Sequence, residues 1–369
     1  MNTTSTALKA ITAAVLATSL ADTACAQSSV TLFGAVDLAV THGSGSIANK
    51  NQVDTNDLGA SKIALKGTED LGGGLKAGFW IESGFNADNG SGQATNTNNQ
   101  STGAGVGGGG LTWNRRSHVS LGGDWGEIRI GRDFDPQYLN MADFDPFDLG
   151  GSGASQVLYY SITGPTLVRA SNSISYLYGH GFNAAAVGYG PQGFKGSGFQ
   201  FHAMYYLGEN PSGSATSNDG SGYAVRAVYA IGKFTVAGAV SRTRYAAGDV
   251  RQDNAGVGYD FGWAHVMGEY EWDRKGAVSA RGWLAGARVP LPVGSLRVAY
   301  SRYGTDTPDN PRAAKWALGY LYPFSKRTTL YTAVARVTNS GPSTQALNGA
   351  QTAAGAPSSG FDLGILHTF

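Results

Sequence analysis

The chain has one cysteine, few charged residues and no long hydrophobic run after its first 26 residues. Charged residues make up 14% of the sequence, whereas soluble domains usually contain about 25%. The formal net charge of +1 provides no electrostatic basis for binding nucleic acid. A membrane-spanning helix needs about 20 mostly apolar residues, so no such helix is expected. These absences exclude a disulfide-stapled domain, a helical membrane protein and a nucleic-acid binder.

Residues 1–26 have the features of a secretory signal peptide. Lys9 supplies the positive charge, residues 10–21 a short apolar core, and residues 24–26 a cleavage site of small residues. Cleavage at this site removes Cys25, the only cysteine. Cys25 also allows a lipoprotein interpretation, although the polar residues just before it are a poor lead-in. We therefore predict export, with a single domain over residues 27–369.

The rest of the sequence is rich in glycine (55 residues) and tyrosine (18) and alternates apolar with polar or small residues. Val30, Leu32 and Val36 share one face of an extended strand, because successive side chains point to opposite faces. The same period of two recurs in residues 61–68, 76–82, 223–231 and 296–300. A polar and an apolar face on each strand indicates an all-β, antiparallel fold.

The connections between the strands alternate in length. Short turns are predicted at residues 70–74, 122–126, 232, 261–262, 289–294 and 323–326, and long polar links at residues 43–56, 85–112, 134–168, 210–221 and 339–359. Outer-membrane barrels show this asymmetry, with short periplasmic turns and longer outer loops. We count sixteen strands of roughly ten residues, the length that a tilted strand needs to cross a bilayer. Residues 179–198 fit either an extra strand or an enlarged turn.

The last residues of the chain favour a membrane barrel. Phe361, Leu363, Ile365 and Phe369 share one strand face, and Phe369 is the terminal residue. Chain ends of soluble domains usually fray into water, whereas the closing strand of a membrane barrel ends in an aromatic girdle. We therefore interpret Phe369 as a C-terminal assembly signal. A secreted soluble β-sandwich would explain the alternation, but neither the loop asymmetry nor Phe369.

Several stretches carry a family resemblance: residues 28–34 (Ser-Ser-Val-Thr-Leu-Phe-Gly), 65–76, 79–83, 114–121, 126–132 and the closing strand. Together they resemble the trimeric general-diffusion porins of Gram-negative bacteria, in the betaproteobacterial, anion-preferring branch. The resemblance implies a sixteen-stranded transmembrane antiparallel β-barrel with a water-filled pore. It also implies a homotrimer in the outer membrane, in contact with lipid and lipopolysaccharide. The third extracellular loop, residues 134–168, is expected to fold inward and narrow the channel.

Strand alternation and the resemblance together suggest the basic side of a pore constriction. Alternation points Lys62, Arg129 and Arg169 into the lumen, and the resemblance adds Arg115 to Lys62 and Arg169. Strict alternation would instead face Arg115 to lipid and turn Arg116 inward, unless a bulge reverses the two. Both therefore remain candidates. Arg132 is a further candidate, because the neighbouring Gly131 offers a break in the alternation.

The acidic side of the constriction is expected at Glu82 and, in the third loop, at Asp143, Asp145 and Asp148. These loop acids also fit ordinary turn residues that hold the loop's own backbone. Each basic residue likewise has an alternative as a solvated wall charge. We favour that alternative for Arg226 and Arg297.

No motif suggests catalysis. The glycine-rich residues 103–110 are flanked by polar loop, not by a strand and a helix, so they do not predict a nucleotide site. The six histidines show no metal-ligand spacing, and no Gly-x-Ser-x-Gly pattern occurs. The sequence predicts a porin for small hydrophilic solutes and ions, with a mild anion preference, and neither metal, cofactor nor enzymatic activity. A substrate-specific anion or dicarboxylate channel and a surface adhesion barrel are the alternatives.

Overall fold

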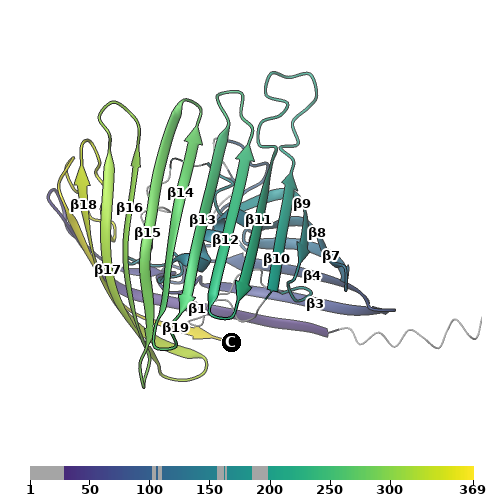
Figure 1. The fold of residues 1–369 in the computed structure, drawn as a ribbon, viewed down its shortest axis with the longest axis horizontal. Coiled ribbons are helices and arrows are strands. Elements are labelled where there is room, and N and C mark those ends of the chain that lie inside the picture. The colour runs from purple at the N-terminus through teal and green to yellow at the C-terminus, as the bar shows by residue number, and fades with distance from the viewer. Residues whose placement is uncertain (1–28, 102–104, 107–109, 156–161, 163, 185–197) are drawn as a thin grey trace, which may run out of the picture.

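The computed structural model describes residues 29–369 except 102–104, 107–109, 156–161, 163 and 185–197, and it forms an antiparallel β-barrel (Figure 1). The predicted signal peptide, residues 1–26, lies outside the described residues. The wall consists of β1 (Ser29–Gly45), β2 (Lys50–Thr55), β3 (Lys62–Gly72), β4 (Leu75–Gly84), β7 (Arg116–Gly123), β8 (Gly126–Phe134), β9 (Arg169–Tyr178), β10 (Gly198–Tyr206), β11 (Gly222–Ile231), β12 (Phe234–Thr243), β13 (Val250–Asp260), β14 (His265–Lys275), β15 (Val278–Pro290), β16 (Ser295–Thr305), β17 (Arg312–Pro323), β18 (Thr328–Ser340) and β19 (Ser358–Thr368). A short pair, β5 (Thr95–Asn96) with β6 (Gly105–Val106), lies in an outer connection.

The described strands form sixteen positions around the wall, as predicted. Both β2 and β3 pair with β1, with Thr55 opposite Leu38 and Lys62 opposite Ala35, so they are one wall strand interrupted at residues 56–61. The ring closes where β1 pairs with β19. β9 pairs directly with β10, so no further strand separates them in the sheet. Residues 179–198 fitted either an extra strand or an enlarged turn, and residues 185–197 of this connection lie outside the described residues.

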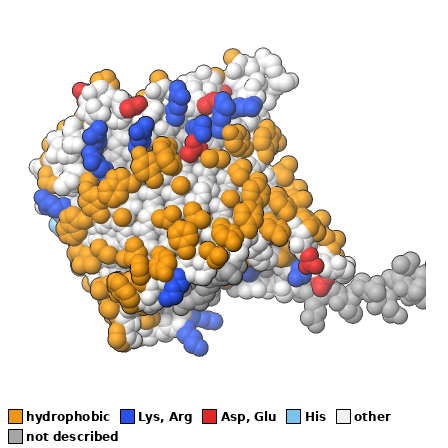
Figure 2. Space-filling model, viewed as in Figure 1, with side chains coloured by type: hydrophobic (Ala, Val, Ile, Leu, Met, Phe, Trp, Pro, Cys, Tyr) orange, Lys and Arg blue, Asp and Glu red, His pale blue; other side chains and the backbone are white. Residues whose placement is uncertain are grey.

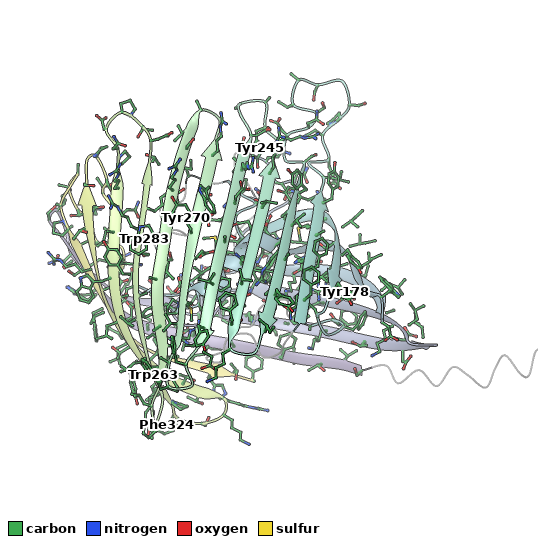
Figure 3. All side chains as sticks on the ribbon, in the orientation of Figure 1. Tyr178, Tyr245, Trp263, Tyr270, Trp283 and Phe324 are labelled. Carbon is green, nitrogen blue, oxygen red and sulfur yellow. The ribbon has the colours of Figure 1, made fainter. Side chains whose placement is uncertain are left out.

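The outer surface of the barrel is apolar because each strand exposes alternate residues to it. Val40, Leu363 and Trp316 are 61%, 55% and 47% exposed, while their chain neighbours on the opposite face are more buried. In Figure 2 the hydrophobic side chains form a broad band, with Lys and Arg gathered along its upper margin. Figure 3 places Trp263 and Phe324 near the turn end and Tyr270 and Trp283 higher on the wall. This is the arrangement that a lipid-facing barrel with aromatic girdles requires.

The predicted short turns are present, but one predicted long link is wrong. Gly72, Gly73 and Gly74 all have positive φ, which explains why this turn is built from glycine. Residues 43–56, expected to be a polar link, are largely strand, because β1 continues to Gly45 and β2 begins at Lys50. Residues 43–45 and 50–55 extend the strands beyond the apolar band, where both faces of a strand are polar. Their polarity therefore resembles that of a loop.

Phe369 helps to close the ring. Its backbone exchanges two hydrogen bonds with Gly34, at 3.0 and 3.1 Å. A Cβ atom at Gly34 would lie 2.5 Å from both the Phe369 ring and the Lys62 carbonyl oxygen, so only glycine fits beneath the terminal ring. The first strand and the last residue are therefore shaped for one another.

One helix, α2 (Pro136–Phe144), follows β8 and packs against β11 to β14. Asp135 caps it by accepting a hydrogen bond from the Gln137 N–H at 3.0 Å, and Pro136 occupies the first turn. Phe144 packs over Gly256, where a Cβ would lie 2.1 Å from its ring. Among the described residues, no helix is long and apolar enough to cross a membrane.

Candidate pore constriction

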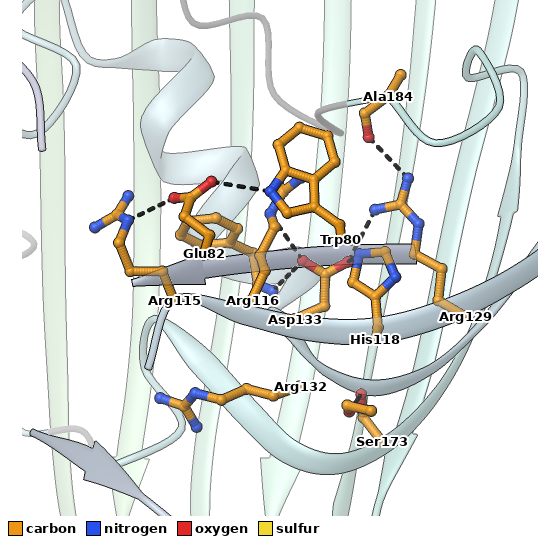
Figure 4. Close-up of polar contacts among 12 residues, drawn as sticks. Trp80, Glu82, Arg115, Arg116, His118, Arg129, Arg132, Asp133, Ser173 and Ala184 are labelled. Atoms are coloured by element: carbon orange, nitrogen blue, oxygen red, sulfur yellow. Dashed lines mark hydrogen bonds and ion pairs between the residues drawn. The ribbon is translucent and has the colours of Figure 1, made fainter. Parts of the chain in front are cut away.

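Two inner surfaces carry the charged residues that the sequence predicts for the constriction. One is the cation-rich wall of β3, β4, β7, β8 and β9, shown in part in Figure 4. The other is the connection after β8, whose described residues contact the inner side chains of β11, β13, β15, β16 and β19.

Glu82 organises the first group of cations. Its Oε1 atom lies 2.6 Å from Arg115 Nε and 3.6 Å from Lys62 Nζ, and its Oε2 accepts a hydrogen bond from Trp80 Nε1 at 3.1 Å (Figure 4). The Glu82 side chain is 2% exposed, whereas Lys62 is 28% exposed. Lys62 is therefore the member of this group with the most access to water.

Arg115 and Arg116 both point inward. Arg116 is the first residue of β7 and follows the alternation, with its side chain 2% exposed. Arg115 precedes the strand, so the lipid-facing parity assigned to it by strict alternation does not apply, and it reaches the inward-facing Glu82. The structure thus keeps both arginines on the lumen side without a bulge between them.

The ring of Phe134 lies next to three guanidinium groups. The Arg169, Arg116 and Arg115 Cζ atoms lie 4.3, 4.9 and 5.8 Å from its centroid. Arg116 also lies 4.4 Å from the Trp80 ring. Contacts between cations and aromatic faces stabilise each charge and restrict its orientation. The two rings therefore hold like charges together that would otherwise repel one another.

Asp133 organises a second, deeper network. Its carboxylate lies 3.2 Å from Arg116 Nε, 2.8 Å from Arg129 Nη1 and 3.8 Å from His118 Nε2 (Figure 4). Arg129 also binds Glu127 through two hydrogen bonds of 3.0 and 3.1 Å. Arg129 is 1% exposed, so this network braces the wall instead of presenting charge to the lumen.

Arg132 is hydrogen-bonded to the connection between β4 and β7 and to β9. A bulge separates Gly131 from Asp133, which confirms the expected break in alternation. Arg132 then donates hydrogen bonds to the Asn114 carbonyl at 2.6 Å, the Asn96 carbonyl at 3.1 Å and Ser171 Oγ at 2.7 Å. It fastens the connection between β4 and β7 to the barrel.

The three loop acids all have partners. Asp143 pairs with Arg226, and Asp148 pairs with Arg288 at 2.5 Å and Arg297 at 2.8 Å. The favoured reading of Arg226 and Arg297 as solvated wall charges is therefore wrong, because both are 2% exposed and clamp the loop. Arg288 is not among the residues predicted from the sequence, although alternation along β15 turns its side chain inward.

Asp145 acts as a turn residue, as its alternative interpretation proposed. It accepts backbone hydrogen bonds from Phe147 at 2.7 Å and Ser155 at 2.8 Å. Burial raises its pKa to about 6, against the opposing effect of these two N–H donors. Burial likewise raises the pKa of the helix-capping Asp135 to about 8. Both acids thus serve the loop's own backbone.

The fold and the lumen define a class of protein. A sixteen-stranded barrel is too wide for its side chains to fill, the outer band is apolar, and the interior is lined with ion pairs. These features are those of a transmembrane β-barrel channel.

Comparison with known proteins identifies the family. The chain belongs to the Gram-negative porin family, whose model matches residues 10–342. Outer membrane porin protein 32 of Delftia acidovorans is 32% identical over 97% of this chain and 99% of its own length. The anion-selective porin from Comamonas acidovorans has a TM-score of 0.76 at 28% identity, covering 93% and 100% of the two chains. The trimer form of OmpT from Vibrio cholerae shares the fold, with a TM-score of 0.60 at 12% identity and coverage of 93% and 99%. The chain is thus a general-diffusion channel of the outer membrane.

Proposed function

We propose that this porin passes small hydrophilic solutes with a preference for anions, set by Lys62, Arg115 and Arg169. The observation that carries the proposal is that two loop acids, Asp143 and Asp148, form ion pairs with arginines of the barrel wall. The opposite wall keeps more cations than carboxylates around Glu82. Charges along a narrow passage with low-dielectric walls select ions by sign.

The rings beside these arginines support the same proposal. A guanidinium held by Phe134 is already oriented before an ion arrives, so little entropy is lost when it attracts chloride or a carboxylate. Lys62 is more exposed than Glu82, its ion-pair partner, and lies opposite Gly84 of β4. We further infer that the protein has no enzymatic activity.

Export and assembly complete the proposal. We infer that residues 1–26 are a cleaved signal peptide and that the mature chain forms a homotrimer. The outer face supports an interface on one side: the highly exposed apolar residues of β1, β7 and β8 are aliphatic, as in Val30, Val119 and Ile130. Those of β11 to β17 include many aromatics, as in Tyr229 and Trp316. Aromatic girdles mark lipid contact, so the aliphatic side is the better candidate for subunit contact.

The selectivity proposal is tested by reversal potentials in planar bilayers across a KCl gradient. The purified protein should reverse toward the chloride equilibrium potential, and Arg169→Glu should move reversal toward potassium. Arg251→Gln is the matched control, because Arg251 is an exposed outer-face arginine paired with Asp253. Reversal that is the same in all three proteins would remove Arg169 from the constriction. Saturable conductance with inhibition by one solute would instead favour a substrate-specific channel.

A further inference from the structure

The connection between β9 and β10 is longer than the other connections at the same end of the barrel. Two to four residues join the strands at the six other turns of this end, whereas residues 179–197 join β9 to β10. Short turns mark the periplasmic end of an outer-membrane barrel. The structure describes residues 179–184 of this connection, and the constriction described above makes no use of them.

The described part of the connection lies along the wall of the barrel and does not stop at the rim. Asn183 Nδ2 donates hydrogen bonds to two backbone carbonyls, that of Gly67 on β3 at 2.8 Å and that of Phe79 on β4 at 3.2 Å. In the sheet, β7 and β8 stand between β9 and β4. Neighbouring strands are about 4.8 Å apart, so the chain extends roughly 14 Å along the wall to reach these carbonyls.

Two glycines of the wall leave the space that this segment fills. A Cβ atom at Gly78 would lie 3.0 Å from Ser120 Oγ and 3.1 Å from Asn183 Nδ2. Ser120 is 7% exposed and its two chain neighbours are exposed on the outer face, so this space is on the lumen side. A Cβ atom at Gly122 would lie 2.8 Å from the Phe182 ring. Phe182 and Asn183 therefore pack on the inner face of the wall.

Two charged residues of β8 hold the backbone of the same segment. Glu127 Oε2 accepts a hydrogen bond from the Asn183 N–H at 3.0 Å, and Arg129 Nη2 donates one to the Ala184 carbonyl at 2.7 Å (Figure 4). Side chains cannot fill a barrel of this width, yet Glu127 and Arg129 are only 3% and 1% exposed. The segment thus contributes to covering them, because it lies between these side chains and the water of the channel.

Asparagine suits position 183 in two respects. Its φ of 50° lies in the left-handed region, where asparagine is enriched among residues other than glycine. Its amide nitrogen also carries two N–H donors, and the two wall carbonyls accept hydrogen bonds from it. An aspartate would tolerate the same backbone conformation, but it would place a carboxylate oxygen against both carbonyls. Asn183→Asp therefore breaks the anchor without changing the size of the side chain.

We propose that Phe182 and Asn183 narrow the channel at its periplasmic end and help to set the largest solute that passes. Arg129, which contacts the segment, precedes Phe134 by five residues on β8. At about 3.3 Å per residue, the narrowing lies roughly 16 Å along the strand from the arginines around Phe134. The two regions act in series, and the periplasmic one discriminates by size. This inference does not depend on the proposed anion preference.

Polymer exclusion from one side of a planar bilayer tests the size limit. Neutral polyethylene glycols of increasing mass are added to the periplasmic compartment of oriented channels, and a polymer that enters the pore lowers its conductance. Phe182→Ala removes a ring from the inner wall, so larger polymers should enter from this side and the conductance in polymer-free KCl should rise. The extracellular cut-off should stay the same, because the loop that carries α2 is nearer that entrance. An identical periplasmic cut-off in the wild type and Phe182→Ala would overturn the proposal.

Thiol labelling tests the anchor separately. Ser120→Cys, in a Cys25→Ala background, places a thiol beside Asn183. Asn183→Asp should raise its rate of labelling roughly thirtyfold, the factor that corresponds to about 1 kcal/mol for each of two lost hydrogen bonds. The periplasmic polymer cut-off of Asn183→Asp should also rise.

The matched control removes two hydrogen bonds from another turn at the same end. Ser325 Oγ accepts hydrogen bonds from the Arg327 and Thr328 N–H groups in the exposed turn between β17 and β18. Ser325→Ala should leave both the labelling rate and the polymer cut-off unchanged. An unchanged labelling rate in Asn183→Asp would overturn the anchor. Faster labelling with an unaltered periplasmic cut-off would overturn the role of the segment in limiting solute size.

Discussion

Replacing Asp148 should release the loop from the barrel wall. Its two carboxylate oxygens accept hydrogen bonds from Arg288 Nη2 at 2.5 Å and Arg297 Nη1 at 2.8 Å, and the side chains of Asp148, Arg288 and Arg297 are 11%, 4% and 3% exposed. Hydrogen bonds between charged groups contribute about 1.5 kcal/mol or more each when they are buried. Asp148→Asn removes the charge from both, so the attached state should lose about 3 kcal/mol relative to the detached state. This corresponds to a rise of roughly a hundredfold in the detached population.

Thiol labelling of a single buried cysteine measures that population. Ala154 is fully buried in the same loop, and a Cys25→Ala background has no other thiol. The rate at which Ala154→Cys reacts with a water-soluble thiol reagent reports how often the loop opens. Asp148→Asn should raise this rate roughly a hundredfold. Asp249→Asn, which breaks an exposed pair with Arg242, should not, because surface pairs contribute little. An unchanged rate in Asp148→Asn, or an equal rise in both variants, would refute the reasoning.

Three further predictions concern the lumen and the wall. Glu82→Gln removes the carboxylate among the constriction cations, so reversal in a KCl gradient should move further toward chloride; movement toward potassium would contradict it. Burial and neighbouring carboxylates raise the pKa of Asp57 to about 8 from 3.8. The contribution of Asp57 to folding stability should therefore fall as pH rises from about 4 to about 8, and Asp57→Asn should remove this part of the pH dependence in thermal unfolding at pH 5, 7 and 9. Gly256→Ala should displace Phe144 and α2, altering single-channel conductance, whereas Gly238→Ala, with its nearest atom at 3.8 Å, should not.

The parts of the fold that depend on local pattern were predictable. Alternation and glycine-rich turns are properties of neighbouring residues, so the strand count and the short turns followed from them. The strand tips at residues 43–45 and 50–55 were not predictable, because polar residues beyond the apolar band look the same in a strand and in a loop. The sequence pattern does not show how far a strand continues beyond the surface of the membrane.

The site was predictable only in part, for a related reason. Alternation correctly turned Arg116 and Arg226 inward, but it could not assign their partners, since Arg226 meets Asp143 from a segment 83 residues away. Arg115 was misplaced by strict alternation because the rule holds only inside a strand, and β7 begins one residue later. The pairing of loop acids with wall arginines, which decides the charge balance, belongs to tertiary structure.

Phe134 has a mechanical consequence for the channel. It is the last residue of β8 and directly precedes Asp135, the cap of α2, so one aromatic ring belongs both to the rigid wall and to the start of the loop. The guanidinium groups of Arg115, Arg116 and Arg169 rest against this ring. A displacement of α2 therefore rotates the Phe134 ring and moves the three guanidinium groups that contact it. Sub-conductance states produced by the loop will differ from the open state in their ratio of chloride to potassium permeability, so gating and ionic discrimination are one mechanical event.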